Sequence, residues 1–128
     1  MNEKAYLSAK GNEAEVSLPV GTAVHVKVKA NSKATQKVRL TGQGVDQEFT
    51  GGGERNTVIG EMEFTPSGTT PLTAVFEYAG DDGVFKPSSL TRGGPYEIGK
   101  YHLMIAVAEN GDDSDYNDTI LEFSWHTK

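Results

Sequence analysis

The sequence predicts an all-β protein, an antiparallel β-sandwich of about eight to ten short strands. Apolar and polar residues alternate in several short segments of the 128-residue chain, and no segment has the period of an amphipathic helix. Fifteen glycines and five prolines supply turns between these segments. Short strands that regularly alternate with turns are typical of a sandwich. The length suits one domain, and we assign residues 1–128 to it.

The alternation is clearest in six segments. The last of them places Leu121, Phe123 and Trp125 on one face, so we expect that face in the core with Trp125 as its anchor, and a sugar-stacking Trp125 as the alternative. The six predicted strands are 24–29, 37–40, 57–64, 72–78, 101–107 and 119–125.

Three stretches have no strand pattern of their own. Gly51–Gly53 is interpreted as a turn, because no helix and no Lys-Ser/Thr pair follows it as a phosphate-binding loop requires. The Gly-, Pro- and Ser-rich stretch 81–99 is interpreted as an irregular excursion between strands. Residues 1–12 are expected to form an N-terminal arm or an extra strand.

Negative charge is concentrated near the C-terminal end. The net charge is −6, and five acidic residues with no Lys or Arg lie between Glu109 and Asp118. The remaining 13 acidic residues nearly balance the 12 basic ones. Without a basic stripe the chain is not expected to bind nucleic acid, and without a long apolar run it is not expected to insert in a membrane.

The acidic segment has the chemistry of a calcium site. Asp113, Asp115 and Asn117 alternate, and a curled backbone would turn their oxygens toward one point. Oxygen ligands without His or Cys favour Ca²⁺ over zinc or copper. An EF-hand is excluded, because Asp118 occupies its glycine position and Ser124 its bidentate glutamate position. From the residues alone, a solvated acidic turn and a purely structural calcium site remain open.

The same segment resembles a known family. The run Glu109–Asp118, followed by an apolar strand that ends in Trp125, is similar to the C-terminal signature of the bacterial two-calcium lectins that bind fucose and mannose (fucose-binding lectin II type). Upstream motifs agree in order, namely Leu18-Pro19, Ala30-Asn31-Ser32, Thr35-Gln36-x-Val38, Phe49-x-Gly51 and Asn56-x-Val58-Ile59-Gly60. The resemblance covers the chain from Leu18 onward, with a longer connection around 81–99.

The resemblance implies two adjacent Ca²⁺ ions in each site, which coordinate sugar hydroxyls directly. It also implies a homodimer or homotetramer, because the family uses the C-terminal carboxylate of a neighbouring subunit. The implied metal ligands are Asn31, Glu109, Asp113, Asp115, Asn117, Asp118 and the terminal carboxylate of Lys128 from the neighbour. The implied sugar-contacting residues are Ser32, Lys33, Glu54 and Asn110.

Among the departures from the family pattern, two are consistent with a loss of sugar binding. Asn110 replaces an acid that contacts the sugar, and Lys128 replaces a terminal glycine. The alternative function is therefore a calcium-stabilised structural or adhesive sandwich that does not bind sugar. An enzyme is not expected, because the three histidines are dispersed and have no Cys partner or nucleophile. Residues 1–10 lack a secretory signal, so we expect cytoplasmic synthesis with non-classical export to the cell surface or beyond.

Overall fold

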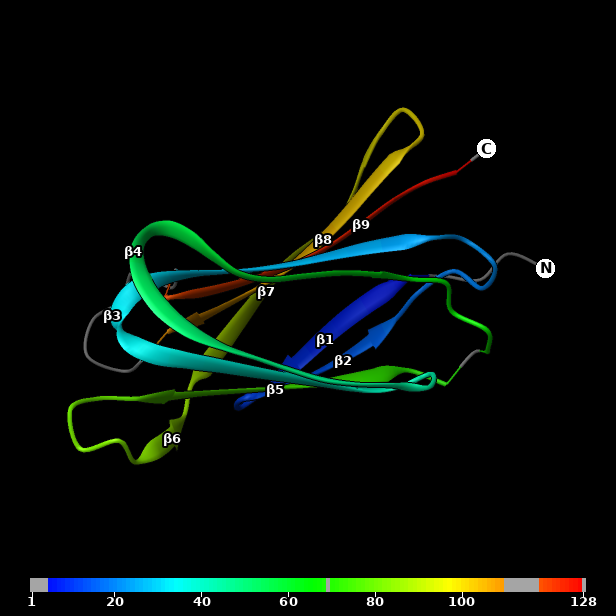
Figure 1. The fold of residues 1–128 in the computed structure, drawn as a ribbon. Helices are drawn as coiled ribbons and strands as arrows, with labels where there is room; N and C mark the ends of the chain where they lie inside the picture. Colours follow the sequence, from blue (N-terminus) through cyan, green and yellow to red (C-terminus); the bar gives the residue numbers. More distant parts are fainter. Residues whose placement is uncertain (1–4, 69, 110–117, 128) are drawn as a thin grey trace.

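A computed structural model describes residues 5–68, 70–109 and 118–127, and its described part is built from nine antiparallel strands (Figure 1). The predicted all-β class is confirmed. No helix long and apolar enough to cross a membrane occurs in the described residues. The strands are β1 (Tyr6–Lys10), β2 (Glu13–Ser17), β3 (Val24–Gly42), β4 (Val45–Phe64), β5 (Leu72–Ala79), β6 (Phe85–Pro87), β7 (Ser89–Ile98), β8 (Tyr101–Glu109) and β9 (Thr119–His126).

One sheet folds over to make both layers of the sandwich. Its order is β1-β2-β5-β3-β9-β8-β7, with β4 paired to β3 and β6 to β5. The first half of β3 pairs with β9, and its second half pairs with β5. The predicted strands 24–29 and 37–40 are therefore the two halves of one 19-residue strand. Its bend, around Asn31–Ala34, is the turning point between the layers, and β4 follows the same curve (Figure 1).

The core lies between the two layers. Alternate residues of β3 and β9 enter it, and Leu121, Phe123 and Trp125 are all buried as the alternation predicts. Trp125 is only 4% exposed, so it is a core anchor and has no open face for a sugar. On β8 the buried apolar residues are Met104, Ala106 and Ala108, and Leu103, Ile105 and Val107 lie half-buried on the opposite face.

The interpretation of Gly51–Gly53 as a turn between strands is wrong. These glycines lie inside β4, on its curve. A Cβ on Gly52 would meet the carbonyl oxygen of Ala34 at 3.1 Å, and one on Gly51 would meet the Ile59 side chain at 2.8 Å. The glycines are needed because β4 must curve closely around the bend of β3.

The interpretation of 81–99 as irregular is also wrong, because most of this stretch forms β6 and β7. β7 pairs with β8 and is interrupted by a register shift between Gly93 and Tyr96. Most of its residues are exposed, and it ends the strand order of the sheet. An exposed edge strand with glycine, proline and a bulge has no apolar alternation to reveal it.

The N-terminal segment contributes an extra strand, one of the two predicted possibilities. β1 pairs antiparallel with β2, and Leu7 of β1 is buried in the core. The N–H of Leu90, in β7, donates to the carbonyl oxygen of Gly11 at 3.2 Å. The two ends of the folded sheet therefore come close together.

Candidate functional site

Two acidic residues stand where β8 ends and β9 begins. Ala108 of β8 pairs with Thr119 of β9, and the Asp118 N–H donates to the Ala108 carbonyl at 2.9 Å. Glu109 and Asp118, the next residues outward, are each only 5% exposed. Carboxylates are rarely buried unless they are paired or bind a metal, so their burial points to a site of specific chemistry.

Asn31 joins this pair from the bend of β3. Its N–H donates to the Asp118 carbonyl at 2.9 Å, and its side-chain Oδ1 accepts the N–H of Arg55 at 2.9 Å. The residue therefore connects β4, β3 and the start of β9.

The residues predicted to contact sugar lie on the two curved segments beside Asn31. Ser32 pairs with Gly53, and its Oγ accepts the Ala34 N–H at 3.1 Å. The Thr57 hydroxyl donates to the Glu54 carbonyl at 2.8 Å. Lys33 and Glu54 are exposed, so their side chains form a charged rim around the bend.

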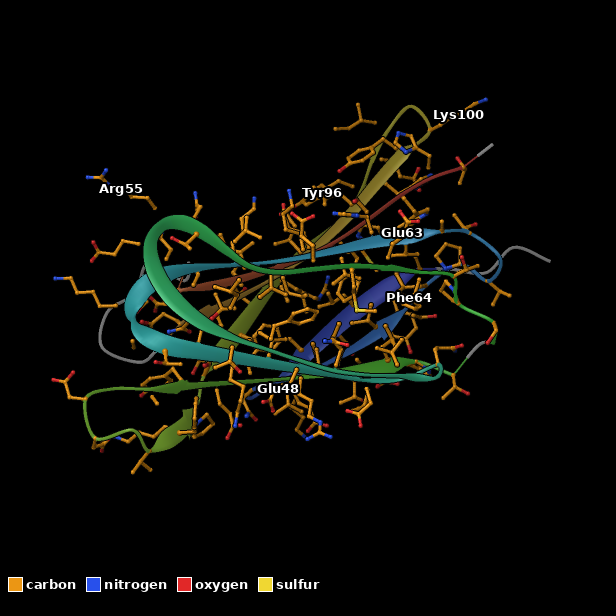
Figure 2. The ribbon with its side chains drawn as sticks, viewed as in Figure 1. Glu48, Arg55, Glu63, Phe64, Tyr96 and Lys100 are labelled. Atoms are coloured by element: carbon orange, nitrogen blue, oxygen red, sulfur yellow. The ribbon has the colours of Figure 1, made fainter. Side chains whose placement is uncertain are left out.

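Residues Arg55 and Asn56 form a tight turn next to this rim. Their φ values are +64° and +57°, a conformation that non-glycine residues seldom adopt. The bond from the Arg55 N–H to Asn31 and the Thr57 bond to Glu54 hold the turn in place. Figure 2 shows the Arg55 side chain projecting away from the body of the protein at the curve of β4.

A buried polar pair beneath the bend was not singled out from the sequence. The Thr119 hydroxyl donates to Gln36 Oε1, and Gln36 Nε2 donates to the Ala34 carbonyl at 3.1 Å. Gln36 is 0% exposed and Thr119 is 1% exposed. The pair ties the residue after Asp118 to the segment that carries Ser32. The sequence did indicate that Gln36 points inward, because it shares a strand face with the apolar Val38.

The structure thus brings together Asn31, Glu109 and Asp118, with Ser32, Lys33 and Glu54 around them. Asn110, Asp113, Asp115, Asn117 and Lys128 lie outside the described residues, so their predicted roles stay predictions. Within the described ranges, no three His, Cys, Asp or Glu side chains gather as a metal site. The described donors are carboxylate and amide oxygens, the ligand type that suits Ca²⁺.

The histidines lie elsewhere and have structural surroundings. The His102 ring is stacked on Trp125, with centroids 5.3 Å apart and planes 2° apart. His25 Nε2 lies 3.7 Å from a Glu61 carboxylate oxygen on the outer surface of the sheet. Neither histidine is part of the cluster around Asn31.

The fold and the site together define a β-sandwich protein with an oxygen-rich site where the sheet turns from one layer to the other. Residues 16–127 match the family described as fucose-binding lectin II (PA-IIL), and the chain belongs to this family. The predicted resemblance is therefore confirmed. Lectins bind carbohydrate and are not enzymes, which agrees with the expectations from the sequence.

Solved structures share the fold. A high-affinity mannose-binding lectin from Ralstonia solanacearum is similar at 24% identity and a TM-score of 0.70, covering 94% of this chain and 100% of its own. A Chromobacterium violaceum lectin in complex with α-methyl-fucoside is similar at 23% identity, with the same TM-score and coverage. The C-terminal domain of the BC2L-C lectin from Burkholderia cenocepacia is similar at 16% identity and a TM-score of 0.62, covering 93% and 98%. No curated protein matches the chain.

Proposed function

We propose that the protein is a calcium-dependent lectin that binds fucose- or mannose-type sugars at the bend of β3. Two Ca²⁺ ions would be held by Asn31, Glu109, Asp113, Asp115, Asn117, Asp118 and a terminal carboxylate from a second copy. When bound, calcium supplies open coordination positions for sugar hydroxyls. Membership of the lectin family supports carbohydrate binding, and the neighbours whose titles name mannose and a fucoside support these sugar types.

The observation that carries the proposal is the convergence of Asn31 with Asp118 and Glu109. Two buried carboxylates beside an amide oxygen form an oxygen-rich lining of the kind that a hard divalent cation prefers. A hard divalent cation would offset the repulsion between the acids, and the Asn31 amide oxygen is of the ligand type that such a cation prefers. Neither role needs a histidine, and the described part of this site contains none.

The rim would select the sugar. Ser32, Lys33 and Glu54 lie on the curved segments next to Asn31, and Asn110 follows Glu109 directly in the sequence. Serine, lysine and asparagine can donate hydrogen bonds to sugar oxygens, and glutamate can accept them from hydroxyls. These residues would distinguish between sugars that present the same hydroxyl arrangement to calcium.

In this proposal the terminal carboxylate of Lys128 would come from a second copy. β9 starts beside Asp118 and runs for eight residues to His126, about 23 Å at about 3.3 Å per residue. Figure 1 shows β9 ending at the opposite end of the molecule from the β3 bend. Two further residues do not return the chain to its own site. An antiparallel neighbour would place its own terminus there.

The outer face of β8 and β9 is a suitable surface for that neighbour. Leu103, Ile105, Val107 and Ile120 lie there, and Tyr96 of β7 is paired with Leu103 and 51% exposed (Figure 2). We call these five residues the β8 face. Contiguous apolar side chains on a solvent-facing sheet are typical of protein interfaces. A homodimer through the β8 face would cover them and set the strands of the two copies antiparallel.

Titration calorimetry with methyl α-fucoside and methyl α-mannoside, in calcium and again in chelator, tests the proposal. Binding in calcium that disappears with chelator is the expected result. A melting temperature that falls in chelator, without binding of either sugar, would instead favour the calcium-stabilised structural or adhesive sandwich; the departures at Asn110 and Lys128 are the observations behind that alternative. Sugar binding that survives chelation would refute the role of calcium.

A further inference from the structure

A short projection extends from the sheet beside the bend of β3. It runs from Ala79 through a turn to Pro87 and contains β6; we call it the finger. The Gly83 N–H donates to the Gly80 carbonyl at 3.0 Å, and the Val84 N–H donates to Asp82 Oδ1 at 3.0 Å. Val84 is nevertheless 57% exposed and Phe85 is 36% exposed. The finger therefore presents two apolar side chains to solvent on a hydrogen-bonded turn.

The strand register places Phe85 close to the rim of the proposed site. Thr35 of β3 pairs with Ala79 of β5, which pairs with Phe85 of β6. Phe85 is thus two strand spacings, about 10 Å, from Thr35. Thr35 comes directly after the Ser32–Ala34 segment, which carries the rim residue Lys33. Figure 1 shows the finger and the β3 bend at the same end of the molecule.

The Phe85 ring is also fixed in orientation. The Lys37 ammonium lies 4.0 Å from the ring centroid, and the same ammonium is 3.3 Å from a Glu77 carboxylate oxygen. Lys37 thereby covers one side of the ring and connects it to β3 and β5. An aromatic side chain held in this way loses little further freedom when a ligand covers its open side.

We propose that Phe85, together with Val84, forms a second subsite that binds the saccharide unit next to the one held at the bend of β3. A pyranose presents an apolar face of C–H groups, and covering the ring with that face removes apolar surface from water. The ligand class is therefore an oligosaccharide whose terminal fucose- or mannose-type residue occupies the main site. This inference rests on the proposed sugar binding at that site.

A purely structural role for Phe85 makes a different prediction. Phe85 lies next to Ala79, which is 4% exposed, and an apolar cover over Ala79 would require only bulk. Phe85→Leu retains apolar bulk and removes the aromatic face, whereas Phe85→Trp retains an aromatic face. The subsite predicts that Trp preserves oligosaccharide binding and that Leu weakens it. A structural cover predicts that neither change alters sugar selectivity.

Calorimetry in calcium with methyl α-mannoside and with α1,2-, α1,3- and α1,6-linked mannobiose tests the subsite. In the wild type, at least one mannobiose should bind about threefold to tenfold more tightly than the monosaccharide. Phe85→Ala and Phe85→Leu should abolish this difference while monosaccharide affinity and melting temperature stay near the wild-type values. Val84→Ala should reduce the difference in part. Val20→Ala, an exposed valine outside the finger and 39% exposed, is the matched control and should leave it unchanged.

The outcomes separate the two proposals. Monosaccharide binding with no mannobiose preference, or with a preference that survives Phe85→Ala, would overturn the subsite and leave the lectin proposal intact. Loss of both ligands in the wild type would overturn the lectin proposal and the subsite together. A mannobiose preference that is lost in Phe85→Leu and retained in Phe85→Trp supports the subsite.

Discussion

Replacement of Thr119 by valine should destabilise the protein by removing one hydroxyl beneath the site. The Thr119 hydroxyl donates to Gln36 Oε1 in a region where both residues are at most 1% exposed. The amide orientation of Gln36 is fixed from its other end, because Nε2 donates to the Ala34 carbonyl at 3.1 Å. A flipped amide would set two oxygens against each other there. Valine therefore leaves Oε1 buried without its donor.

The loss can be estimated from the cost of an unsatisfied buried group. Such a group costs about 1–3 kcal/mol, and the near-identical shapes of threonine and valine leave no large cavity to add to it. With an unfolding entropy of about 2.1 cal/mol/K per residue over the 128 residues, the melting temperature should fall by about 4–11 °C. The pair also ties Ala34 to the start of β9, so the affinity for sugar should fall as well. The change in the free energy of sugar binding should be smaller than the change in the free energy of unfolding.

Differential scanning calorimetry in chelator isolates this effect from calcium binding. Thr65→Val, at an exposed position just after β4, is the matched control and should melt with the wild type. The double variant Gln36→Leu/Thr119→Val removes both partners of this bond but also the Gln36 Nε2 donor of the Ala34 carbonyl, so its loss of stability should be smaller than the sum of the two single losses. A Thr119→Val protein that melts no lower than Thr65→Val would refute the buried hydrogen bond, and additive losses in the double variant would refute the coupling.

Three further predictions address the metal ligands, the dimer surface and the terminal carboxylate. Asp115→Ala should abolish calcium uptake, measured by calorimetry, because it removes a carboxylate from the proposed ligand set; wild-type calcium affinity would contradict the assignment. Ile105→Asp should convert a dimer to a monomer in sedimentation velocity and weaken sugar binding, since a charge at the centre of the β8 face opposes its burial. One residue added after Lys128 should weaken sugar binding while the dimer persists, and unchanged binding would remove the terminus from the site.

The alternation of residues identified β3, β5, β8, β9 and the second half of β4, but it did not identify β2, β6 or β7. It was decisive where one face is polar, as in β9, where Leu121 and Phe123 alternate with Glu122. It was not decisive on β8, because Leu103, Ile105 and Val107 alternate with residues that are also apolar. The smaller set is buried, since the core already receives Phe123 and Trp125 from the adjacent β9. The sequence of one strand does not specify how much room the neighbouring strands leave for its side chains in the core.

Pattern also failed where strands are exposed or bent. β7 has no apolar alternation because most of its residues face solvent at the edge of the sheet. The glycines at Gly51–Gly53 suggest a turn by composition, yet they allow one strand to curve around another. In both places the controlling fact is the position of a partner strand, which the local sequence does not specify.

The site could be anticipated only in part. Spacing within the acidic segment pointed to a metal, but nothing local linked that segment to Asn31, and only the family resemblance did so. The physical link is the folding of the sheet, which pairs the first half of β3 with β9 and so carries Asn31 to Asp118. The Gln36–Thr119 pair depends on the same folding.

The hydrogen bonds that hold the bend do not involve the Lys33 and Glu54 side chains, which would help to select a sugar. Asn31 is attached to Asp118 through its backbone N–H, and the 54–57 turn is held by the Asn31 oxygen and the Thr57 hydroxyl. The side chains of Lys33 and Glu54 extend from this frame into solvent and make none of these bonds. Their replacement therefore removes little folding energy, because exposed positions outside caps and networks contribute little to stability. The fold can thus keep its ligand frame while the rim and the finger change, and specificity can vary without cost to the sandwich.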